Sequence, residues 1–375
     1  SMTDNSSRLI LGMSSGTSAD SVDMALVRIS GRGQQREVSV ECSGELTFDT
    51  ELQDEVHHFV AHYDQPLAQL DKKLAFFFGD CVNNFLEENG VAVSEVDCVA
   101  SHGQTVFHHD GDPRQGSLQL GDLQTIADRC RVSVIGDFRQ ADLHAGGQGA
   151  PISVFADWVL HSDEKSECAI LNLGGIANIS YLRPGAPPLA WDCGPANGPL
   201  DALMRLKAGQ HCDIDGKLAL SGTVNSELYL LLISNPYFSK KLPKSTGLEL
   251  FGSRWLGEIC DAHPQLSSKD ILATLCSVVA YGVSSSLASA GLSPSTIYLC
   301  GGGRHNRALV KALQSEMPGI VFADYSQLGF DADLREAIAF ALLADAKLLG
   351  EYSTWLSTTG AVKPSVLGNV VHSRT

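Results

Sequence analysis

The sequence predicts an α/β protein of two domains, and three observations carry this prediction. Segments typical of strands alternate with segments typical of helices along most of the chain. Two strand–turn–strand units with glycine-rich turns, at residues 9–27 and 169–180, stand far apart in the sequence. A chain of 375 residues is also longer than one hydrophobic core usually supports. We place the first domain at residues 1–135 and the second at 136–349, and expect residues 350–375 to pack back on the first.

The individual elements follow from the spacing of apolar residues. Short apolar runs that end at glycine or polar residues predict strands, whereas apolar residues three or four positions apart predict helices. The predicted strands are residues 9–11, 22–27, 37–46, 96–100, 132–136, 169–173, 176–180 and 296–299. The predicted helices are residues 51–61, 67–89, 270–287, 308–313 and 334–349.

Three turns of small residues follow predicted strands. They are Gly12–Ser18, Gly174-Gly175 and Cys300–Asn306. Turns without side-chain bulk expose backbone N–H groups, and such clusters of donors bind phosphate oxygens. We therefore expect the first two turns to hold the phosphates of one nucleotide. The third, between a strand and a helix, is expected to seat the nucleoside.

Composition and charge limit the partners. Hydrophobic residues make up 44% and charged residues 19% of the chain, and no stretch approaches the ~20 apolar residues that span a bilayer, so no membrane partner is expected. A formal net charge of −16 disfavours nucleic acid. An anionic nucleotide would then need local amide donors and a metal. The ten cysteines form no C-x-x-C pair, which indicates buried thiols and a cytoplasmic protein.

Other motifs favour competing interpretations. Gly12–Gly16 fits the G-x-S-x-G nucleophile elbow of α/β-hydrolases with Ser14 as nucleophile, but that elbow needs a helix next, and a strand-like run follows. No Walker-type or G-x-G-x-x-G phosphate loop is present. His57, His58 and His62 have helical spacing and could mimic a metal site, although a solvated helix face explains them better.

Two acidic segments each allow a structural and a functional interpretation. Asp192 precedes a Gly-Pro turn, where it could cap the turn or act as an uncovered carboxylate. Residues 137–142, which include Arg139 and Asp142, precede the glycine-rich residues 146–151. This polar patch could be a surface turn with an ion pair, or a site for a planar or anionic group that Arg139 would bind.

Long motifs along nearly the whole chain resemble the anhydro-N-acetylmuramic acid kinase family, in the family's order and spacing. They are residues 15–23 (SGTSADSVD), 102–106 (HGQTV), 136–139 (GDFR), 146–151 (GGQGAP), 172–178 (NLGGIAN), 192–195 (DCGP), 244–247 (KSTG) and 300–303 (CGGG), with 359–361 and 366–368 in the tail. The resemblance implies a two-lobed actin-like ATPase fold, related to ribonuclease H, with a deep interdomain cleft. It also implies a homodimer. The implied reaction uses ATP and Mg²⁺ to phosphorylate 1,6-anhydro-N-acetylmuramic acid while water opens the anhydro ring, giving N-acetylmuramic acid 6-phosphate for peptidoglycan recycling.

The same resemblance implies roles for particular residues. Asp192 matches the general base that activates water, and Asp20 would serve either the metal or the sugar. The ATP-binding residues would be Ser15, Gly16, Thr17, Ser18, Ala19, Asp20, Ser21, Val22, Gly174, Gly175, Asn178, Gly301, Gly302, Gly303 and Asn306. The sugar-binding residues would be Gln104, Thr105, Arg139, Asp142 and Glu336.

The chain departs from the family pattern in its turns. Ser21 and Ala196 stand where relatives usually carry glycine, and Ser14 where they often carry methionine. Serine at 21 would force a turn to relax if its backbone needed a positive φ. Two other functions stay open: a kinase of another small sugar or acid on the same scaffold, and a binding protein that ATP opens and closes. The second would need a partner-binding insertion, for which the chain has no spare segment.

Overall fold

The computed structural model describes residues 6–375, which form two compact units. Unit 1 contains the residues up to His108, Pro113–Ser162 and Asp333–Thr375, and unit 2 contains His109–Asp112 and Asp163–Ala332. The division falls later in the chain than the sequence predicted. The reason is that helices α5 (Val154–His161) and α13 (Arg335–Leu349) pack on each other, and α13 packs on the first sheet.

Unit 1 is built on a six-stranded sheet of order β13-β7-β4-β1-β2-β3. Strands β1, β4 and β7 are parallel, while β2, β3 and β13 are antiparallel to their neighbours. The strands of this unit are β1 (Arg8–Ser15), β2 (Ser21–Ser30), β3 (Glu37–Thr47), β4 (Cys98–Ser101), β7 (Val134–Gly136) and β13 (Asn369–Val371), with a separate hairpin of β5 (Gln104–His108) and β6 (Ser117–Leu120). Its helices are α1 (Thr50–His62), α2 (Leu67–Glu88), α3 (Leu123–Cys130), α4 (Gln140–His144), α5, α13 and α14 (Leu356–Thr359).

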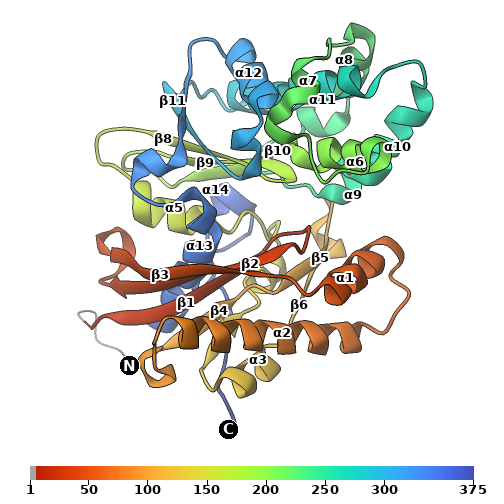
Figure 1. Ribbon diagram of the computed structural model, residues 1–375. Coiled ribbons are helices and arrows are strands. Elements are labelled where there is room, and N and C mark those ends of the chain that lie inside the picture. Colours follow the sequence, from red (N-terminus) through yellow and green to blue (C-terminus); the bar gives the residue numbers. More distant parts are fainter. Residues whose placement is uncertain (1–5) are drawn as a thin grey trace. The chain divides into compact units, whose positions relative to one another are not determined.

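Helices cover both faces of this sheet, and β1 shows how the sequence arranges them. Leu9, Leu11 and Met13 belong to the core formed with α1 and α2, whereas alternate residues face α13, because side chains of a strand alternate between faces. Figure 1 shows α2 along one face of β1–β3 and α13 on the other. A Cβ at Gly12 would lie 1.9 Å from the carbonyl oxygen of Ala337, so only glycine allows α13 to approach this closely.

A buried charge network joins α13 to the sheet. Asp345 accepts from Arg8 Nε at 2.6 Å and from Arg36 Nε at 2.8 Å, and all three side chains are fully buried. Arg36 also pairs with Glu351 at 2.6 Å. Two guanidinium groups thus share one carboxylate, and removing that carboxylate would leave charges in the core.

Unit 2 has a five-stranded sheet of order β10-β9-β8-β11-β12. Its strands are β8 (Cys168–Leu173), β9 (Ile176–Leu182), β10 (Leu189–Pro195), β11 (Thr296–Cys300) and β12 (Val321–Asp324). Its helices are α6 (Asn197–Ala208), α7 (Lys217–Leu220), α8 (Ser226–Ile233), α9 (Leu248–Phe251), α10 (Ser253–Ala262), α11 (Ser268–Ser289) and α12 (Arg307–Glu316).

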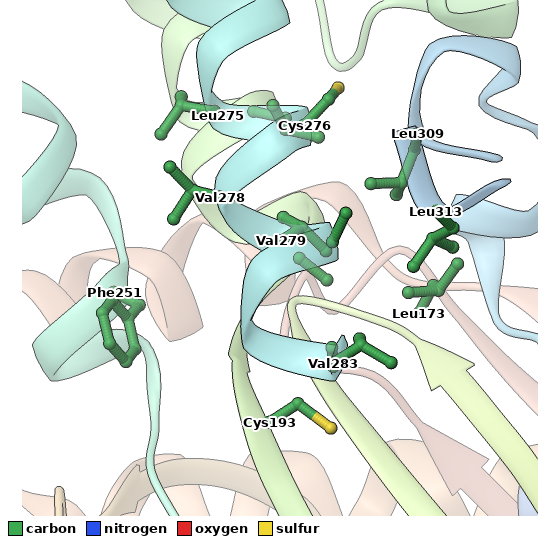
Figure 2. Packing of buried hydrophobic residues seen from close by; sticks show 14 of the residues in the cluster. Leu173, Cys193, Phe251, Leu275, Cys276, Val278, Val279, Val283, Leu309 and Leu313 are labelled. Carbon is green, nitrogen blue, oxygen red and sulfur yellow. The ribbon is translucent and has the colours of Figure 1, made fainter. Parts of the chain in front are cut away.

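Helix α11 is the centre of the core of unit 2. Figure 2 shows Val279 and Val283 on the side of α11 that faces Leu309 and Leu313 of α12, whereas Leu275 points to the opposite side. By length and composition α11 would be able to cross a membrane, contrary to the expectation that no stretch of the sequence comes close. Its long apolar surface is instead used for packing, since 72% of its most apolar window is buried.

The predicted strands and helices are confirmed, with shifts of a few residues at their ends. The largest shift concerns the first glycine turn: β1 continues through Ser15, so the turn itself spans only residues 16–20. The expectation of buried thiols is confirmed for eight of the ten cysteines. All ten cysteines are free thiols, of which eight are buried, Cys42 is half-buried and Cys212 is exposed.

The network around Asp345 yields a stability prediction. The substitution Asp345→Asn should lower the free energy of unfolding by about 3–5 kcal/mol, because Arg8 and Arg36 would stay buried without a counter-charge. Urea unfolding followed by circular dichroism measures the change. As a control, Glu55→Gln breaks the surface pair with Lys73 and should cost at most about 1 kcal/mol. A loss for Asp345→Asn no larger than the control's would contradict the prediction.

Candidate functional site

The first glycine turn joins β1 to β2 and exposes its backbone. Gly16, Thr17 and Ser18 are exposed, and Ala19 N donates to Gly16 O at 3.0 Å to close the turn. A Cβ at Gly16 would meet only Ser18 Oγ, at 3.9 Å, so a ligand can approach the backbone here. The positive φ of this turn falls on Ala19 (φ 52°), and Ser21 begins an ordinary strand. Ser21 therefore does not need a positive φ, and the turn has no backbone strain at this residue.

Side chains from strand β5 and helix α1 hold this turn in place. Gln104, fully buried, donates through Nε2 to Gly16 O at 2.9 Å and accepts from Ser15 Oγ. His57 Nε2 lies 2.6 Å from Ser18 O, so that nitrogen carries the proton. Gln53 Nε2 donates to Asp20 Oδ1 at 2.9 Å. Gln104, predicted to contact the sugar, therefore shapes the turn, as does the fully buried Val22.

Glu336 is placed by the close approach of α13. It lies in the first turn of the helix, is exposed, and accepts from Ser14 Oγ at 2.8 Å. Its neighbour Arg335 forms a buried ion pair with Asp157 of α5, with Nε 3.2 Å from Oδ1. Ser14 lies inside β1, and another strand follows it, so the geometry of a hydrolase nucleophile elbow is not present here.

Arg139 and Asp142 both hold the glycine-rich loop that follows them. Asp142 is fully buried; Oδ2 accepts from Gly149 N at 2.8 Å and Oδ1 from Thr359 Oγ1 at 2.6 Å. Burial raises the pKa of this carboxyl group. Arg139 Nη1 donates to Gly149 O at 2.7 Å and stays half-buried. Of the two, only Arg139 keeps surface for a ligand. Thr105 is half-buried as well and accepts from Gln119 at 3.3 Å.

His102 belongs to the HGQTV motif but is not among the site residues predicted from the sequence. It is 7% exposed and stacks on Phe340 with ring centroids 4.6 Å apart. Within residues 6–375, neither ring nitrogen has a hydrogen-bond partner. Burial, and after it the charge of Arg139, holds the pKa of His102 well below its usual value. The imidazole is therefore neutral at pH 7.

The second glycine turn, in unit 2, joins β8 to β9 and is bonded to the start of α6. Gly174 O accepts from Asn197 N at 2.9 Å, and Gly175 O accepts from Ala196 N and Gly198 N, each at 3.0 Å. A Cβ at Gly174 would meet nothing closer than 3.5 Å, so the outer side of this turn is open. The first amides of α6 are thus used by the turn itself.

The third glycine turn follows β11, and its glycines serve two purposes. A Cβ at Gly301 would lie 2.6 Å from Asn172 Oδ1, and one at Gly303 would lie 2.6 Å from Leu173 Cβ. These two glycines therefore let the turn pack on β8, whereas Gly302 has nothing within 4 Å. Asn306 Oδ1 accepts from Leu309 N at 3.0 Å and so caps α12.

Asp192 lies inside β10, at a β-bulge between Asp192 and Gly194, and is held at three points. Its Oδ2 accepts from Thr246 N at 2.9 Å, its N–H donates to Lys244 O at 3.0 Å, and its carbonyl accepts from the Tyr237 hydroxyl at 2.7 Å. The residue is 7% exposed. The bond from Thr246 N orients the carboxylate, and the two main-chain bonds fix the strand that carries it.

Unit 2 brings several predicted residues to one end of its sheet. Asp192 is paired with Asn178 of β9, which lies close to the Gly174-Gly175 turn, and Cys300 at the end of β11 is paired with Asn172 near the end of β8. Thr246, Lys244 and Tyr237 are not among the site residues predicted from the sequence. For Thr246 and Lys244 the KSTG motif was an available signal, whereas nothing in the sequence pointed to Tyr237.

The only metal ligand predicted is Asp20, which is exposed beside the first turn. Residues 6–375 contain no cluster of three or more His, Cys, Asp or Glu side chains that could hold a metal, and His57, His58 and His62 are no exception. Magnesium in phosphate sites is usually held by one or two carboxylates together with phosphate and water. A single aspartate at the first turn fits that donor set.

Comparison with known proteins gives consistent results. The family described as "Anhydro-N-acetylmuramic acid kinase" matches residues 8–373. A protein of that name from Gloeobacter violaceus is 36% identical over 371 residues, covering 96% of this chain and 98% of the relative. Another, from Caldanaerobacter subterraneus subsp. tengcongensis, is 30% identical, covering 97% and 96%. Among solved structures, the ADPNP-bound activator of the 2-hydroxyisocaproyl-CoA dehydratase from Clostridium difficile is similar with a TM-score of 0.45 and 13% identity, covering 91% of this chain and 97% of that one.

The buried, neutral His102 yields a pH prediction. In the unfolded chain this histidine takes up a proton near pH 6.5, whereas in the folded chain its pKa is depressed, so the free energy of unfolding should fall as the pH drops below about 6.5. The variant His102→Phe should lose up to about 1.4 kcal/mol less per pH unit between pH 6.5 and 5. Urea unfolding at a series of pH values measures the slope. An unchanged slope for His102→Phe would be evidence against a neutral His102.

Proposed function

We propose, on the premise that this chain belongs to the anhydro-N-acetylmuramic acid kinase family and is a phosphotransferase, that it phosphorylates 1,6-anhydro-N-acetylmuramic acid while water opens the anhydro ring. The product would be N-acetylmuramic acid 6-phosphate. The observation that supports this most directly is Asp192, a nearly buried residue whose carboxylate accepts from Thr246 N, whose backbone is held at two further points, and which is paired with Asn178 near a glycine turn. A group fixed in this way suits a general base, because its direction is set before the reaction begins.

In the proposed reaction, Asp192 takes a proton from water. The water oxygen attacks the anomeric carbon, the bond from that carbon to the bridging O6 breaks, and O6 forms a bond to the γ-phosphorus. The water proton goes to Asp192 and from there to solvent. ATP, when bound, would supply the phosphoryl group, and the bond from the γ-phosphorus to the β,γ-bridging oxygen would break to release ADP. Placement of the reacting atoms is the main task of the protein in such a reaction.

The nucleotide would be held mainly by backbone. Gly16, Thr17 and Ser18 present an open, exposed turn for the phosphates, and Gly174 and Gly175 form a second turn with an open side. Asn178 adds a side-chain amide beside that second turn. At Gly302 the third turn is open for the nucleoside, while Gly301 and Gly303 shape it and Asn306 caps the next helix. These positions fit a polyphosphate because a Cβ is absent where oxygens must approach.

Mg²⁺ would be held by Asp20 together with the phosphates. Gln53 orients this carboxylate through Oδ1, and the adjacent turn is the first phosphate-binding turn. We assign Asp20 to the metal rather than to the sugar for this reason. The chemistry that the ion supplies is neutralisation of charge on the transferred phosphoryl group.

The sugar would be contacted by Arg139, Glu336 and Thr105, which keep exposed or half-buried surface. The substrate is a carboxylic acid, and the planar guanidinium group of Arg139 suits a carboxylate. Gln104 and Asp142 are fully buried and bonded to the chain, so we assign them supporting roles.

The proposal also covers the role of the product in the cell, the compartment and the partners of the protein. The product would feed peptidoglycan recycling, and the free thiols fit a reducing compartment such as the cytoplasm. We expect a homodimer whose partners are small molecules rather than nucleic acid or membranes. Turnover with other sugars or acids but not with the anhydro sugar would favour the alternative kinase.

If water is the nucleophile, one oxygen of the product comes from the solvent. ADP formation should depend on the anhydro sugar, and in ¹⁸O-labelled water the product should carry one solvent oxygen at C1, because water is the nucleophile. Mass spectrometry of product quenched at early times measures the label. Product made beforehand in ordinary water and placed in labelled water for the same time gives the background from spontaneous exchange. Label at the background level would exclude attack by water.

A further prediction concerns the base. Asp192→Asn should lower kcat by roughly 10²–10⁴-fold, the usual loss when a general base is removed, while ATP affinity changes little. A coupled ADP assay and calorimetric titration of MgATP measure the two quantities. Asp261→Asn, an exposed aspartate on α10, should behave as wild type. Near-normal turnover of Asp192→Asn would place the base elsewhere.

A further inference from the structure

The loop that precedes α9 holds Asp192 and also carries a hydroxyl group that the protein leaves unsatisfied. Thr246 is 4% exposed, and its N–H is the donor to Asp192 Oδ2 at 2.9 Å. In the described part of the chain, Thr246 Oγ1 has no hydrogen-bond partner. The amide nitrogen and the hydroxyl oxygen of one threonine are three bonds apart. The unpartnered hydroxyl therefore lies in the immediate surroundings of the Asp192 carboxylate.

The loop is fixed without any help from this hydroxyl. Lys244 is buried; its Nζ donates to Tyr237 O at 3.0 Å and lies 4.5 Å from the centre of the Tyr237 ring. The carbonyl of Lys244 accepts from Asp192 N at 3.0 Å. Burial lowers the pKa of the Lys244 ammonium group, and Asp192 is one of the negative groups that act against this shift. Main-chain bonds and Lys244 thus anchor the loop, so Thr246 Oγ1 has no structural task among the described residues.

A buried hydroxyl without a partner destabilises a protein, because it loses its bonds to water and gains none. A valine would fill the same volume without that cost. The hydroxyl at position 246 is thus better explained by a ligand that completes its bonds than by packing. Because Asp192 Oδ2 accepts from the amide of the same residue, a ligand of this hydroxyl would also lie beside a carboxylate.

We propose that Thr246 is a further catalytic residue whose hydroxyl, together with Asp192, holds the attacking water. This inference rests on the proposed function. The water donates one O–H to the Asp192 carboxylate and the other to Thr246 Oγ1, which leaves its lone pairs directed at the anomeric carbon. In the reaction the first proton moves to Asp192 as the new C–O bond forms and the bond to O6 breaks. The second proton stays on oxygen and becomes the hydroxyl proton of the product.

Three variants separate catalysis from stability. Thr246→Val keeps the shape and removes the hydroxyl, Thr246→Ser keeps the hydroxyl, and Thr274→Val is the matched control. Thr274 is fully buried in α11, but its hydroxyl has two partners, Asp270 O at 2.7 Å and Asn225 N at 2.9 Å. Thr274→Val should lower Tm by a few degrees and leave kcat unchanged. Thr246→Val should keep or raise Tm because it removes an unsatisfied group.

For kcat the expected order is reversed: the Thr246 substitution should slow turnover and the Thr274 substitution should not. Thr246→Val should lower kcat on the order of 30- to 100-fold, the scale for losing one hydrogen bond to a charged transition state, with the KM values for ATP and sugar within about threefold. Thr246→Ser should recover most of the wild-type rate. A coupled ADP assay measures kcat and both KM values on the full-length protein.

Methanol provides a readout that a purely structural role would not change. Methanol has a single O–H, so it can donate to Asp192 but has no second proton for Thr246 Oγ1. Wild-type enzyme should therefore discriminate against methanol, and the ratio of methyl glycoside to reducing sugar phosphate should be several-fold higher for Thr246→Val. Mass spectrometry of product formed in dilute methanol gives this ratio. For Thr246→Ser and Thr274→Val the ratio should equal that of wild type.

The outcomes distinguish this inference from the function on which it rests. Wild-type rates and product ratios for Thr246→Val, beside an active wild-type enzyme, would overturn the role of Thr246 alone. A slower Thr246→Val enzyme with an unchanged product ratio would also overturn it, because the hydroxyl would then not touch the nucleophile. A wild-type enzyme without sugar-dependent ADP formation would overturn the proposed function and this inference together.

Discussion

The close packing of helix α13 on strand β1 is the contact on which unit 1 depends. It is possible only because Gly12 has no side chain where the carbonyl of Ala337 lies. From this one approach, Glu336 comes to lie beside Ser14, and Arg335 reaches Asp157. Ten residues further along the same helix, Asp345 meets Arg8 and Arg36. One helix therefore orients a polar group at one end and neutralises the buried charges of the sheet at the other.

Glycine has two different uses in the candidate site, and the structure separates them. At Gly12, Gly301 and Gly303 a side chain would collide with a neighbouring element, so these glycines permit packing. At Gly16 and Gly302 a Cβ would have no close neighbour, so the backbone there is accessible. With a net charge of −16 the chain cannot attract a polyphosphate by its overall field. Open backbone at the second group of glycines gives local donors that do not depend on that field.

Much of the fold could be predicted because it rests on local patterns. The α/β class, the long helices α2 and α11 and the glycine turns follow from apolar spacing and turn residues, and the family was identified from motifs. The division into units could not be predicted in the same way. Residues 136–162 and α13 join unit 1 through contacts between segments about 180 to 330 residues apart, such as Arg335–Asp157 and Ser14–Glu336, which leave no local signal.

The same limit applies to the site. The family resemblance implied that Gln104 and Asp142 bind the sugar. Their complete burial and their bonds to Gly16 and Gly149 depend on tertiary packing, which no spacing reveals. Conversely, Thr246 belongs to the KSTG motif but is not among the site residues predicted from the sequence. Its importance comes from a backbone bond to a residue 54 positions away and from a hydroxyl left without a partner.

The distribution of thiols has a practical consequence. Of the ten cysteines, only Cys212, just after α6, is exposed to solvent. Eight are buried, and Cys42 is half-buried. An alkylating reagent at limiting concentration would thus react first with Cys212 in the chain without substitutions. A fluorophore or spin label could be attached there without first engineering the other nine positions, and its signal would report on unit 2 during turnover.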